Sequence, residues 1–514
     1  MGLVIYPPTI DWSFMKQRPQ HVMEQFARKG HAVLYFNKRN GSGPVIEKAA
    51  ANLFVVRHGA YALDALIPKL SLQGGPLYWT SWSKKIPHAE RFGPACTVIY
   101  DCVDDFPDWE EDERRWLGRA NGIICTAERL ESKMRQAAPH KPIAQVPNGC
   151  EWSFFNKAAA QRTSRIEGVP PWEGPRLGYI GAWAPWVDES LLLRLARDMP
   201  EAQIVIVGPK LRSDEPAFPE NVVFAGYRNY SELPDLLGYM DVCLIPFRLN
   251  RITESTNPIK VYEYLAAGKP VVSTDLPEVR KLEPYVKVAQ TSEQFVEAVK
   301  AACRPDDRDR QKRSLFAKQF SWDRRFSAIE ATLESVAPMF RTADRLLADQ
   351  IAPFARHEAV ELPLIHATLN SYYRDGTFPA SPAWTGVLGG GEYHCYMKLA
   401  KSGLPSGVHK LYLEFETDPA FHDEAEHAFW IGASSSPWSR KTITFRNRPH
   451  SERIGDIRAG TAFGETCSLD VTEFWRGGAT SFHIRCSRDR VTPLYNPRLT
   501  AIIVPGASPE VGGL

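Results

Sequence analysis

A lysine and a glutamate one helical turn apart have the types and spacing for binding a sugar nucleotide. Lys260 and Glu263 lie in residues 257–273, which read NPIKVYEYLAAGKPVVS. At positions i and i+3 the two side chains share one face of a helix, which Gly268 would end before the next strand. An ammonium can bind phosphate oxygens, and a carboxylate can accept hydrogen bonds from ribose hydroxyls. The alternative is an amphipathic helix whose Lys and Glu form an ordinary surface pair.

A second candidate is the glycine that ends the apolar run LGYIG at residues 177–181. Because it has no side chain, Gly181 lets a diphosphate approach the backbone, and the N-terminus of the following helix adds its dipole. A strand-to-helix turn that needs a small residue would give the same pattern.

Three aspartates, Asp101, Asp104 and Asp105, follow another apolar run. At the carboxyl end of a strand, a carboxylate can take the proton from the hydroxyl of a second substrate, the acceptor of a transferred sugar. Neighbouring like charges raise the pKa of this carboxylate toward the neutral range in which a general base works. The alternative is that Asp104 or Asp105 caps the following helix.

Residues 11–21, DWSFMKQRPQH, link the first apolar run to the first helical pattern. We expect Arg18, Gln20 and His21 to lie near the acceptor or a phosphate, with Pro19 at the start of the helix. A histidine in a first helical turn is also commonly structural, so both interpretations of His21 stay open.

The elements that must position these residues are apolar strands alternating with amphipathic helices, a pattern that predicts parallel sheets covered on both faces. In the first 150 residues, strands are expected at 3–6, 32–36, 77–79, 97–100, 122–125 and 143–146. After a break rich in Pro and Gly at 161–175, they are expected at 177–180, 203–207, 222–225, 242–245, 270–273 and 286–289. Helices are expected at 19–29, 110–119, 129–137, 189–197, 232–240, 259–267 and 293–302.

Beyond a helix that begins near Ser321, the period of the hydrophobic pattern changes. Short strands at 411–415, 441–445, 468–471, 481–484 and 499–504 predict an antiparallel β-sandwich. The expected fold class is therefore α/β, with two doubly wound Rossmann-like lobes followed by an all-β sandwich.

The predicted domains are an acceptor lobe at 1–160, a nucleotide-sugar lobe at 161–340 whose last helix packs back on the first lobe, a helical linker at 341–360 and a β domain at 361–514. Aromatic side chains of the last segment predict either a sugar-binding face or an ordinary core: Tyr372, Tyr373, Trp384, Trp430, Trp438 and Trp475.

Composition excludes several classes of protein. A net charge of +2 over 514 residues gives no electrostatic case for a nucleic-acid partner. Nine mostly isolated cysteines predict a reducing compartment, and the spacing of Cys96 and Cys102 does not predict a zinc site. No signal peptide or apolar span is expected, so the predicted location is the cytoplasm, with association at the inner face of the membrane left open. Residues 82–91 hold the small basic and aromatic cluster that would make such a contact, an ordinary solvated turn being the alternative.

The motif at 257–273 resembles the donor-site signature of GT-B glycosyltransferases, and the first 340 residues resemble glycosyltransferase family four of the teichuronic-acid and exopolysaccharide type. The resemblance implies that Glu263 holds the nucleotide ribose. In a subset similar to the xanthan-type glucuronosyltransferase, it also implies that Lys260 meets the diphosphate. Asn257 belongs to the same motif, and Glu254 stands one position from the first glutamate of the family pattern.

Two departures from the family shape the predicted mechanism. The loop after Gly181 lacks the arginine and lysine that many GT-B enzymes carry, so the resemblance leaves the phosphate charge to Lys260 with Arg251 or Arg248. The histidine common in retaining members is missing near Asp101, which favours inversion by direct displacement with Asp104 or Asp105 as base.

The resemblance implies a metal-independent hexosyltransferase without a cofactor, using a nucleotide diphospho-sugar, a UDP-sugar being favoured. The acceptor would be a glycan or lipid-linked sugar in bacterial surface polysaccharide synthesis. The competing hypotheses are a GT-B sugar-nucleotide epimerase or hydrolase, and a glycan-binding protein without turnover.

Overall fold

The computed structural model describes residues 2–72, 74–160, 162–212, 217–304, 307–337, 346–370, 383–388, 391–399, 404–417, 428–439, 443, 446, 448–458, 465–486 and 491–505. The chain divides into two compact units. One takes residues 1–14, 30–73 and 343–514, and the other takes 15–29 and 74–342. The predicted catalytic, donor-binding and acceptor-binding residues, from Arg18 to Glu263, all lie in the second.

The second unit begins with α1 (Arg18–Arg28) and four parallel strands in the order β6 (Leu77–Thr80), β7 (Thr97–Cys102), β8 (Gly122–Cys125) and β9 (Ile143–Gln145). Helices α3 (Glu110–Trp116) and α4 (Glu128–Ala137) lie between these strands in the sequence. Every strand of this group except β9 is buried over most of its length, as continuous apolar runs require of a covered parallel sheet.

A second parallel sheet in the same unit has six strands in the order β12-β11-β10-β13-β14-β15. Their bounds are β10 (Arg176–Ile180), β11 (Gln203–Val207), β12 (Val222–Gly226), β13 (Val242–Ile245), β14 (Val271–Thr274) and β15 (Val286–Ala289). The order changes direction at β10, and ligands of such sheets bind beyond the carboxyl ends of the strands near this point.

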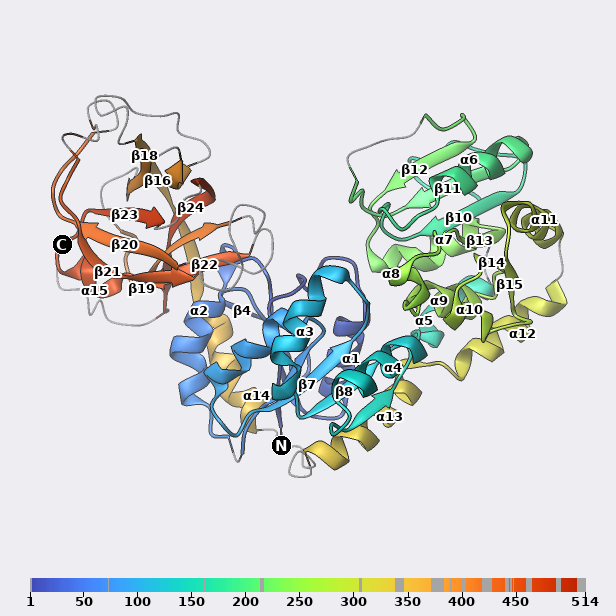
Figure 1. Ribbon diagram of the computed structural model, residues 1–514, viewed down its shortest axis with the longest axis horizontal. Helices are drawn as coiled ribbons and strands as arrows, with labels where there is room; N and C mark the ends of the chain where they lie inside the picture. The colour runs from blue at the N-terminus through green and yellow to red at the C-terminus, as the bar shows by residue number, and fades with distance from the viewer. Residues whose placement is uncertain are drawn as a thin grey trace. The chain divides into compact units, whose positions relative to one another are not determined.

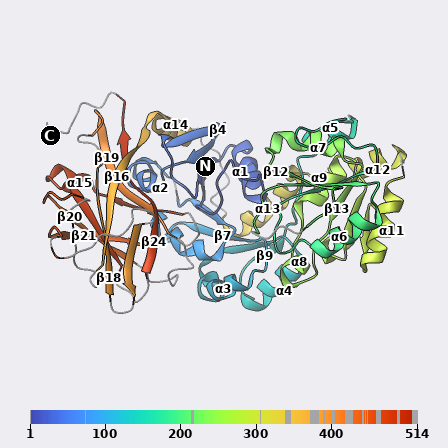
Figure 2. The ribbon, with the colours of Figure 1, turned by 90° about the horizontal axis from the view of Figure 1, so that it is seen from above.

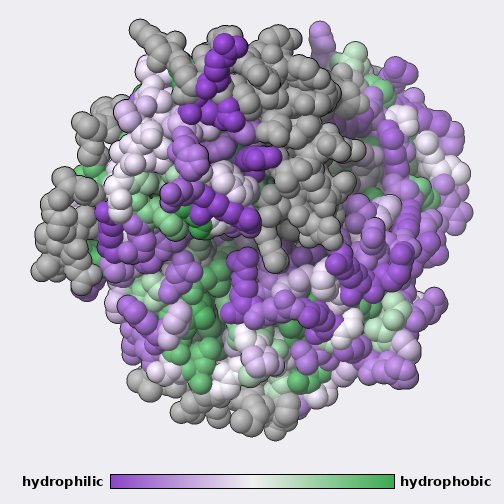
Figure 3. Space-filling model, turned by 60° about the vertical axis from the view of Figure 1, so that its left-hand side comes forward, coloured by the Kyte–Doolittle hydropathy of each residue, from purple (hydrophilic) through white to green (hydrophobic). Residues whose placement is uncertain are grey.

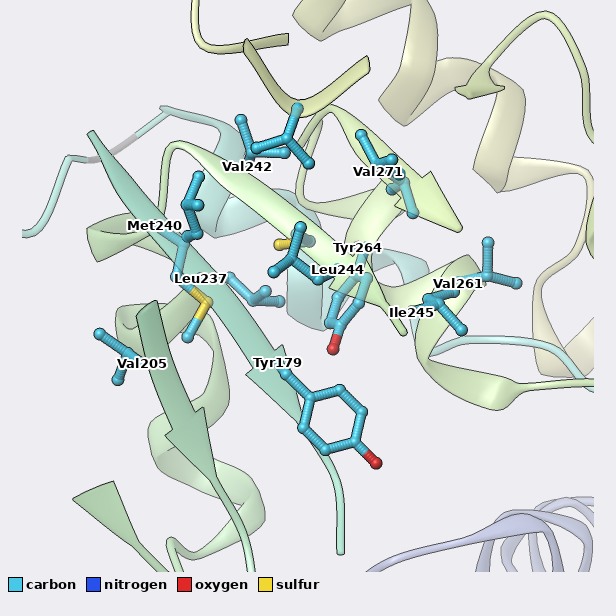
Figure 4. Packing of buried hydrophobic residues seen from close by; sticks show 14 of the residues in the cluster. Tyr179, Val205, Leu237, Met240, Val242, Leu244, Ile245, Val261, Tyr264 and Val271 are labelled. Atoms are coloured by element: carbon cyan, nitrogen blue, oxygen red, sulfur yellow. The ribbon is translucent and has the colours of Figure 1, made fainter. Parts of the chain in front are cut away.

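Helices cover both faces of the second sheet. Figures 1 and 2 agree in placing α6 (Glu189–Asp198) and α11 (Ser292–Ala302) on one side and α5 (Trp152–Ala160), α7 (Leu233–Tyr239) and α9 (Ile259–Ala266) on the other. Between the layers, side chains of β10, β11 and β13 pack against Leu237 and Met240 (Figure 4). The helices α12 (Asp307–Lys318) and α13 (Trp322–Val336) follow, and α13 contacts α1 and β8.

The first unit holds the remaining strands of the N-terminal region, in the order β4 (Ile46–Ala50), β5 (Leu53–Val56), β2 (Ala32–Phe36) and β1 (Leu3–Tyr6). β1, β2 and β5 are parallel, and β4 is antiparallel to β5. Neither β4 nor β5 was predicted from the sequence. The alternation Ile46-Glu47-Lys48 of β4 is short and carries charges, and the apolar run of β5 is only four residues long.

The antiparallel β-sandwich belongs to the same unit. Its strands are β16 (Glu358–Asn370), β17 (Ala383–Leu388), β18 (Gly391–Leu399), β19 (Val408–Glu416), β20 (Ala428–Ser434), β21 (Glu452–Arg458), β22 (Thr466–Asp470), β23 (Ser481–Cys486) and β24 (Val491–Ile503). The long strand β16 joins the two layers, since residues 358–363 pair with β24 and 364–370 with β18. Buried residues of both layers form one core, including Leu413, Phe429 and Ile484.

The fold class predicted from the sequence is confirmed, while the predicted domain boundaries stay predictions. β16 begins at Glu358, before the predicted boundary, and its first residues pair with β3 (Gly43–Pro44). The predicted strand at 441–445 lies outside the described residues except for Ile443. Eight of the nine cysteines are free thiols, and nothing is described of the side chain of Cys486.

Hydrophilic side chains cover most of the described surface on the face drawn in Figure 3, with hydrophobic ones in smaller groups between them. Among the described helices, none combines the length and the apolar character that crossing a membrane requires.

Candidate functional site

Helix α9 carries Lys260 and Glu263 as predicted, and its ends fix its position. Pro258 precedes the first turn, and Gly268, with φ +71°, ends the helix in the left-handed conformation that glycine adopts at low cost. The N–H of Lys269 donates to the carbonyl of Tyr264 at 3.0 Å, which completes the capping motif. The Tyr264 hydroxyl in turn accepts from the Ile180 N–H at 2.8 Å, so α9 is tied to the end of β10.

The Lys260 ammonium lies among aromatic rings and beside a glycine. Its Nζ is 5.2 Å from the ring centroid of Tyr179 and 4.8 Å from that of Phe247. A Cβ at Gly181 would lie 2.9 Å from Lys260 Cε and 3.0 Å from Nζ. Burial lowers the pKa of Lys260 to about 8. Within the described part of the chain, Lys260 forms no hydrogen bond or ion pair.

The Glu263 carboxyl is also withdrawn from water, since the residue is 6% exposed. Burial raises its pKa to about 8, against the opposing charge of Lys260. No other described residue forms a hydrogen bond or ion pair with its side chain. Buried charges are normally paired, so an unpaired ammonium and carboxyl on one helix face are suited to a polar, charged ligand.

Asp104 comes from the loop after β7 and meets the segment just before α9. Its Oδ1 is 3.1 Å from Thr256 Oγ1. Burial raises the pKa of Asp104 to about 7, although the Thr256 hydrogen bond and the charge of Lys260 favour the ionised form. A half-buried carboxyl that titrates near neutrality has the properties of a general base.

Asp105 is engaged in ion pairs. Its two oxygens accept from Arg251 Nε and Nη2 at 2.8 and 2.9 Å, and Oδ1 also accepts from Lys133 at 2.7 Å. Burial opposes ionisation of this carboxyl, but the hydrogen bonds from Arg251 and Lys133 hold its pKa below the usual value. Arg251 contacts Glu110 as well, at 3.1 Å. Both predicted site residues, Asp105 and Arg251, therefore have protein partners.

Asp101 and Arg18 form a buried ion pair. Arg18 Nε lies 2.8 and 3.0 Å from the two carboxylate oxygens, and Trp79 Nε1 donates to Oδ2 at 3.1 Å. Both charged residues are at most 3% exposed. Arg18 also reaches Asn148 Oδ1 at 3.3 Å. The structure thus gives Asp101 and Arg18 a common structural role in holding α1 against the end of β7.

Asn257 continues this polar chain. Its Oδ1 accepts from the Asn148 N–H at 2.9 Å, and its carbonyl accepts from Asn148 Nδ2 at 2.6 Å. Its own Nδ2 donates to Tyr262 Oη at 3.0 Å and to Glu278 Oε2 at 3.3 Å. Asn257 therefore anchors the start of α9, with its amide occupied by protein groups.

His21 and Gln20 are both buried on α1. The His21 ring stacks on Trp322 with centroids 4.9 Å apart, and burial lowers its pKa well below the usual value. Gln20 accepts from the Gln17 N–H at 3.1 Å in a capping box. These positions fit the structural interpretation of His21 that the sequence left open.

One group of potential metal ligands occurs among the described residues, formed by His21, Glu24 and Glu151. Lys16 Nζ lies 2.8 Å from Glu24 Oε1 and 3.0 Å from Glu151 Oε2. Its ammonium already supplies a positive charge to both carboxylates, so the group is explained without a metal ion.

Other predicted contact residues have partners too. Glu254 pairs with Arg129. Lys84 and Lys85, proposed for a membrane contact, are 7% and 0% exposed. A solvated turn is therefore wrong for both lysines, and neither reaches a surface.

Two of the aromatic residues predicted for the β domain pack inside it. Trp438 is 9% exposed, and Lys398 Nζ lies 4.8 Å above its ring. Trp475 packs against the sandwich core. Nothing is described of Tyr372, Tyr373 or the side chain of Trp384, which lie outside the described residues.

The sequence did not single out two residues that shape the site. Gly208, with φ +146°, must lack a side chain because a Cβ would lie 2.1 Å from the carbonyl oxygen of Gly181. The Gly-Pro pair that follows an apolar strand is the feature of the sequence that could have indicated Gly208. Thr256, which contacts Asp104, had no signal beyond its place before Asn257.

Comparison with known proteins agrees with this architecture. The family model of glycosyl transferases group 1 matches residues 174–304. A Bacillus subtilis (strain 168) protein with the provisional name teichuronic acid biosynthesis glycosyltransferase TuaH is 32% identical over 184 residues, which is 34% of this chain. The chain spans 45% of that relative's length.

The structure of sucrose-phosphate synthase from Thermosynechococcus elongatus is similar in fold, with a TM-score of 0.51 at 14% identity. The matched region covers 68% of this chain and 99% of the sucrose-phosphate synthase chain. Residues 174–304 therefore form a glycosyl transferases group 1 domain, in a chain that has the GT-B fold and resembles glycosyltransferase family four.

Proposed function

We propose that the protein is a glycosyltransferase that moves a sugar from a nucleotide diphospho-sugar to a glycan or lipid-linked acceptor in bacterial surface polysaccharide synthesis. The observation that carries the proposal is the pair Lys260 and Glu263 on α9, of which Lys260 is half-buried and Glu263 is buried, and both of which are unpaired among the described residues. The group 1 domain and the similarity to TuaH support the same activity. Uridine diphosphate is the proposed carrier of the sugar.

The proposed reaction is a direct displacement. The acceptor hydroxyl gives its proton to Asp104 while its oxygen forms a bond to the anomeric carbon. The bond from that carbon to the diphosphate breaks, and its electron pair leaves with the diphosphate. Lys260 offsets the charge of the departing group, and Glu263 holds the ribose. In this scheme no metal ion is required.

Donor binding tests the proposal. In Lys260→Met and Glu263→Gln we expect the Kd for UDP, measured by isothermal titration calorimetry at pH 7, to rise about 10- to 100-fold. In the complex, the diphosphate favours the charged form of Lys260, and hydrogen bonds from the ribose hydroxyls favour the ionised form of Glu263. A hydrogen bond to a charged group contributes about 1.5–3 kcal/mol, which accounts for a change of this size.

The matched control is Lys287→Met, because Lys287 is exposed on β15 of the same sheet. It should bind UDP like the wild type. Unchanged affinity in both site variants would refute the assigned donor site. Fast consumption of a UDP-sugar without acceptor would instead favour a hydrolase or epimerase.

Gly181→Ala should weaken UDP binding through Lys260. The new methyl group would lie 2.9 Å from both Lys260 Cε and the Tyr179 hydroxyl. Because Tyr179 is held by its bond to the Ala182 carbonyl, the flexible Lys260 side chain is the one that must move. We expect about tenfold weaker binding, the lower end of the loss for removing a charge-assisted contact. Gly226→Ala is the control, since Gly226 also has a positive φ, +72°, but a Cβ there meets nothing within 4 Å. Equal losses in the two variants would indicate backbone strain as the cause.

A further inference from the structure

The hydroxyl of Thr256 lies between two acceptors. Its Oγ1 is 3.1 Å from Asp104 Oδ1 and 2.8 Å from the carbonyl oxygen of Ile252. A hydroxyl has one proton and can donate to only one acceptor at a time, but it can accept as well. The Ile252 carbonyl also accepts from the Ser255 N–H at 3.1 Å, so it keeps a partner when the hydroxyl turns away.

The same three oxygens can therefore serve both protonation states of Asp104. When the carboxylate is ionised, Thr256 donates to Oδ1. When the carboxyl gains the proton on Oδ2, Oδ1 becomes an uncharged carbonyl oxygen, which accepts from Thr256 more weakly, and the Thr256 hydroxyl can turn to the Ile252 carbonyl. The bond from Thr256 to Oδ1 is therefore stronger in the ionised state.

The hydrogen bond from Thr256 also determines which carboxylate oxygen of Asp104 is left for the substrate. Within the described part of the chain, Asp104 Oδ1 has Thr256 as its partner, and no hydrogen bond reaches Oδ2. With Oδ1 held, Oδ2 is the atom left to accept from an acceptor hydroxyl.

We propose that Thr256 is the positioning residue of the catalytic base, holding Oδ1 of Asp104 and favouring its ionised form. This inference rests on the proposed function, in which Asp104 is the base. The charged groups that act on Asp104 from the elements around it are Lys260 on α9 and Asp105 on its own loop, the latter paired with Arg251 and Lys133.

Thr256→Val and Thr256→Ser form a matched pair for testing the inference. Val keeps the shape and loses the hydroxyl, while Ser keeps the hydroxyl. Without the donor, the ionised form loses support, so the pKa of Asp104 must rise. We expect the acid limb of the profile of kcat/KM against pH to move upward by about one pH unit in Val, which lowers the rate below that limb about tenfold. Ser should keep the wild-type limb, and UDP affinity should stay unchanged in both.

A lower rate in Thr256→Val with an unmoved acid limb would overturn the inference, because a structural role alone gives that result. Infrared titration of the carboxyl band that Asp104→Asn removes measures the same pKa without turnover. An unshifted band in Val would also overturn it. Full transfer by Asp104→Asn would instead refute the proposed base, which separates the two failures.

Discussion

Asp104→Asn should lower kcat about 10²- to 10⁴-fold and leave the Kd for UDP within about twofold of the wild type. This is the range that a positioned general base contributes to proton transfer. Asn keeps the size and the contact with Thr256 Oγ1 but cannot take a proton at neutral pH. Donor affinity should persist because Lys260 and Glu263 remain.

The pH profile gives the same assignment a second measurement. Burial raises the pKa of Asp104 to about 7, and a base acts in its ionised form, so kcat/KM should rise with pH through about 7. Burial lowers the pKa of Lys260 to about 8, so its charge, and with it donor binding, should decline above that pH. Burial also raises the pKa of Glu263 to about 8, so ionisation of Glu263 opposes this decline over the same range. The limb that reports Asp104 is therefore the rise of kcat/KM through about pH 7.

Asp105→Asn is the informative comparison, because the sequence alone does not distinguish the roles of the two aspartates. Its ion pairs with Arg251 and Lys133 keep Asp105 ionised and occupied. We expect Asp105→Asn to retain the acid limb near pH 7. Loss of that limb in Asp105→Asn, with its retention in Asp104→Asn, would reverse the assignment.

Local patterns were enough to predict the donor helix. Residues 257–273 form the expected helix, the Gly268 end and the strand β14, since each depends on neighbours in sequence. The i, i+3 spacing alone placed Lys260 and Glu263 on one face. The strands of both parallel sheets were predictable for the same reason, because a continuous apolar run needs no distant partner to be recognised.

The partners of the other predicted residues depend on distant parts of the chain. Asp105 meets Arg251 across 146 positions, and Arg18 meets Asp101 across 83. A long charged side chain bonds whichever opposite charge the fold brings near, and one sequence does not specify that neighbour. Sequence reasoning therefore proposed these residues for the ligand, while the structure pairs them with each other.

The buried Glu414 was outside sequence prediction altogether, although it joins separate segments of the first unit. Ser468 and Asn40 donate to its Oε1 at 2.5 and 2.7 Å, and Thr500 donates to Oε2 at 2.6 Å. His58 Nε2 lies 2.9 Å from Oε1, and Arg498 Nε lies 3.3 Å from Oε2. Asn40 and His58 thus tie residues 30–73 to the sandwich. In sequence, Glu414 is one of three charged residues of β19, with Lys410 and Glu416, and nothing in the pattern distinguishes it from the other two.

Replacing Glu414 should therefore destabilise the first unit strongly. Glu414→Ala removes the nearest carboxylate from the buried Arg498, which then has Glu416 at 3.5 Å and Glu361 at 3.7 Å. Breaking a buried pair costs about 3–5 kcal/mol. For a unit of this size we expect the melting temperature, measured by calorimetry on the full chain, to fall by about 10 °C. Glu473→Ala is the control, since Glu473 is exposed and pairs with Arg476, and its change should stay within about 0.5 kcal/mol.

The contribution of Glu414 to the free energy of unfolding depends on pH. Burial opposes ionisation of Glu414, but the charges of His58 and Arg498 and the Ser468 hydrogen bond hold its pKa at about 2. The unfolded value is about 4.3, so this stabilisation is present above about pH 4.3 and is lost as the pH falls toward 2, by about 3 kcal/mol in all. Glu414→Gln should lose this part of the acid dependence while the rest remains. Glu414 would not be the charge that joins residues 30–73 to the β-sandwich if Glu414→Gln kept the wild-type acid dependence, or if Glu414→Ala melted within about 2 °C of the wild type.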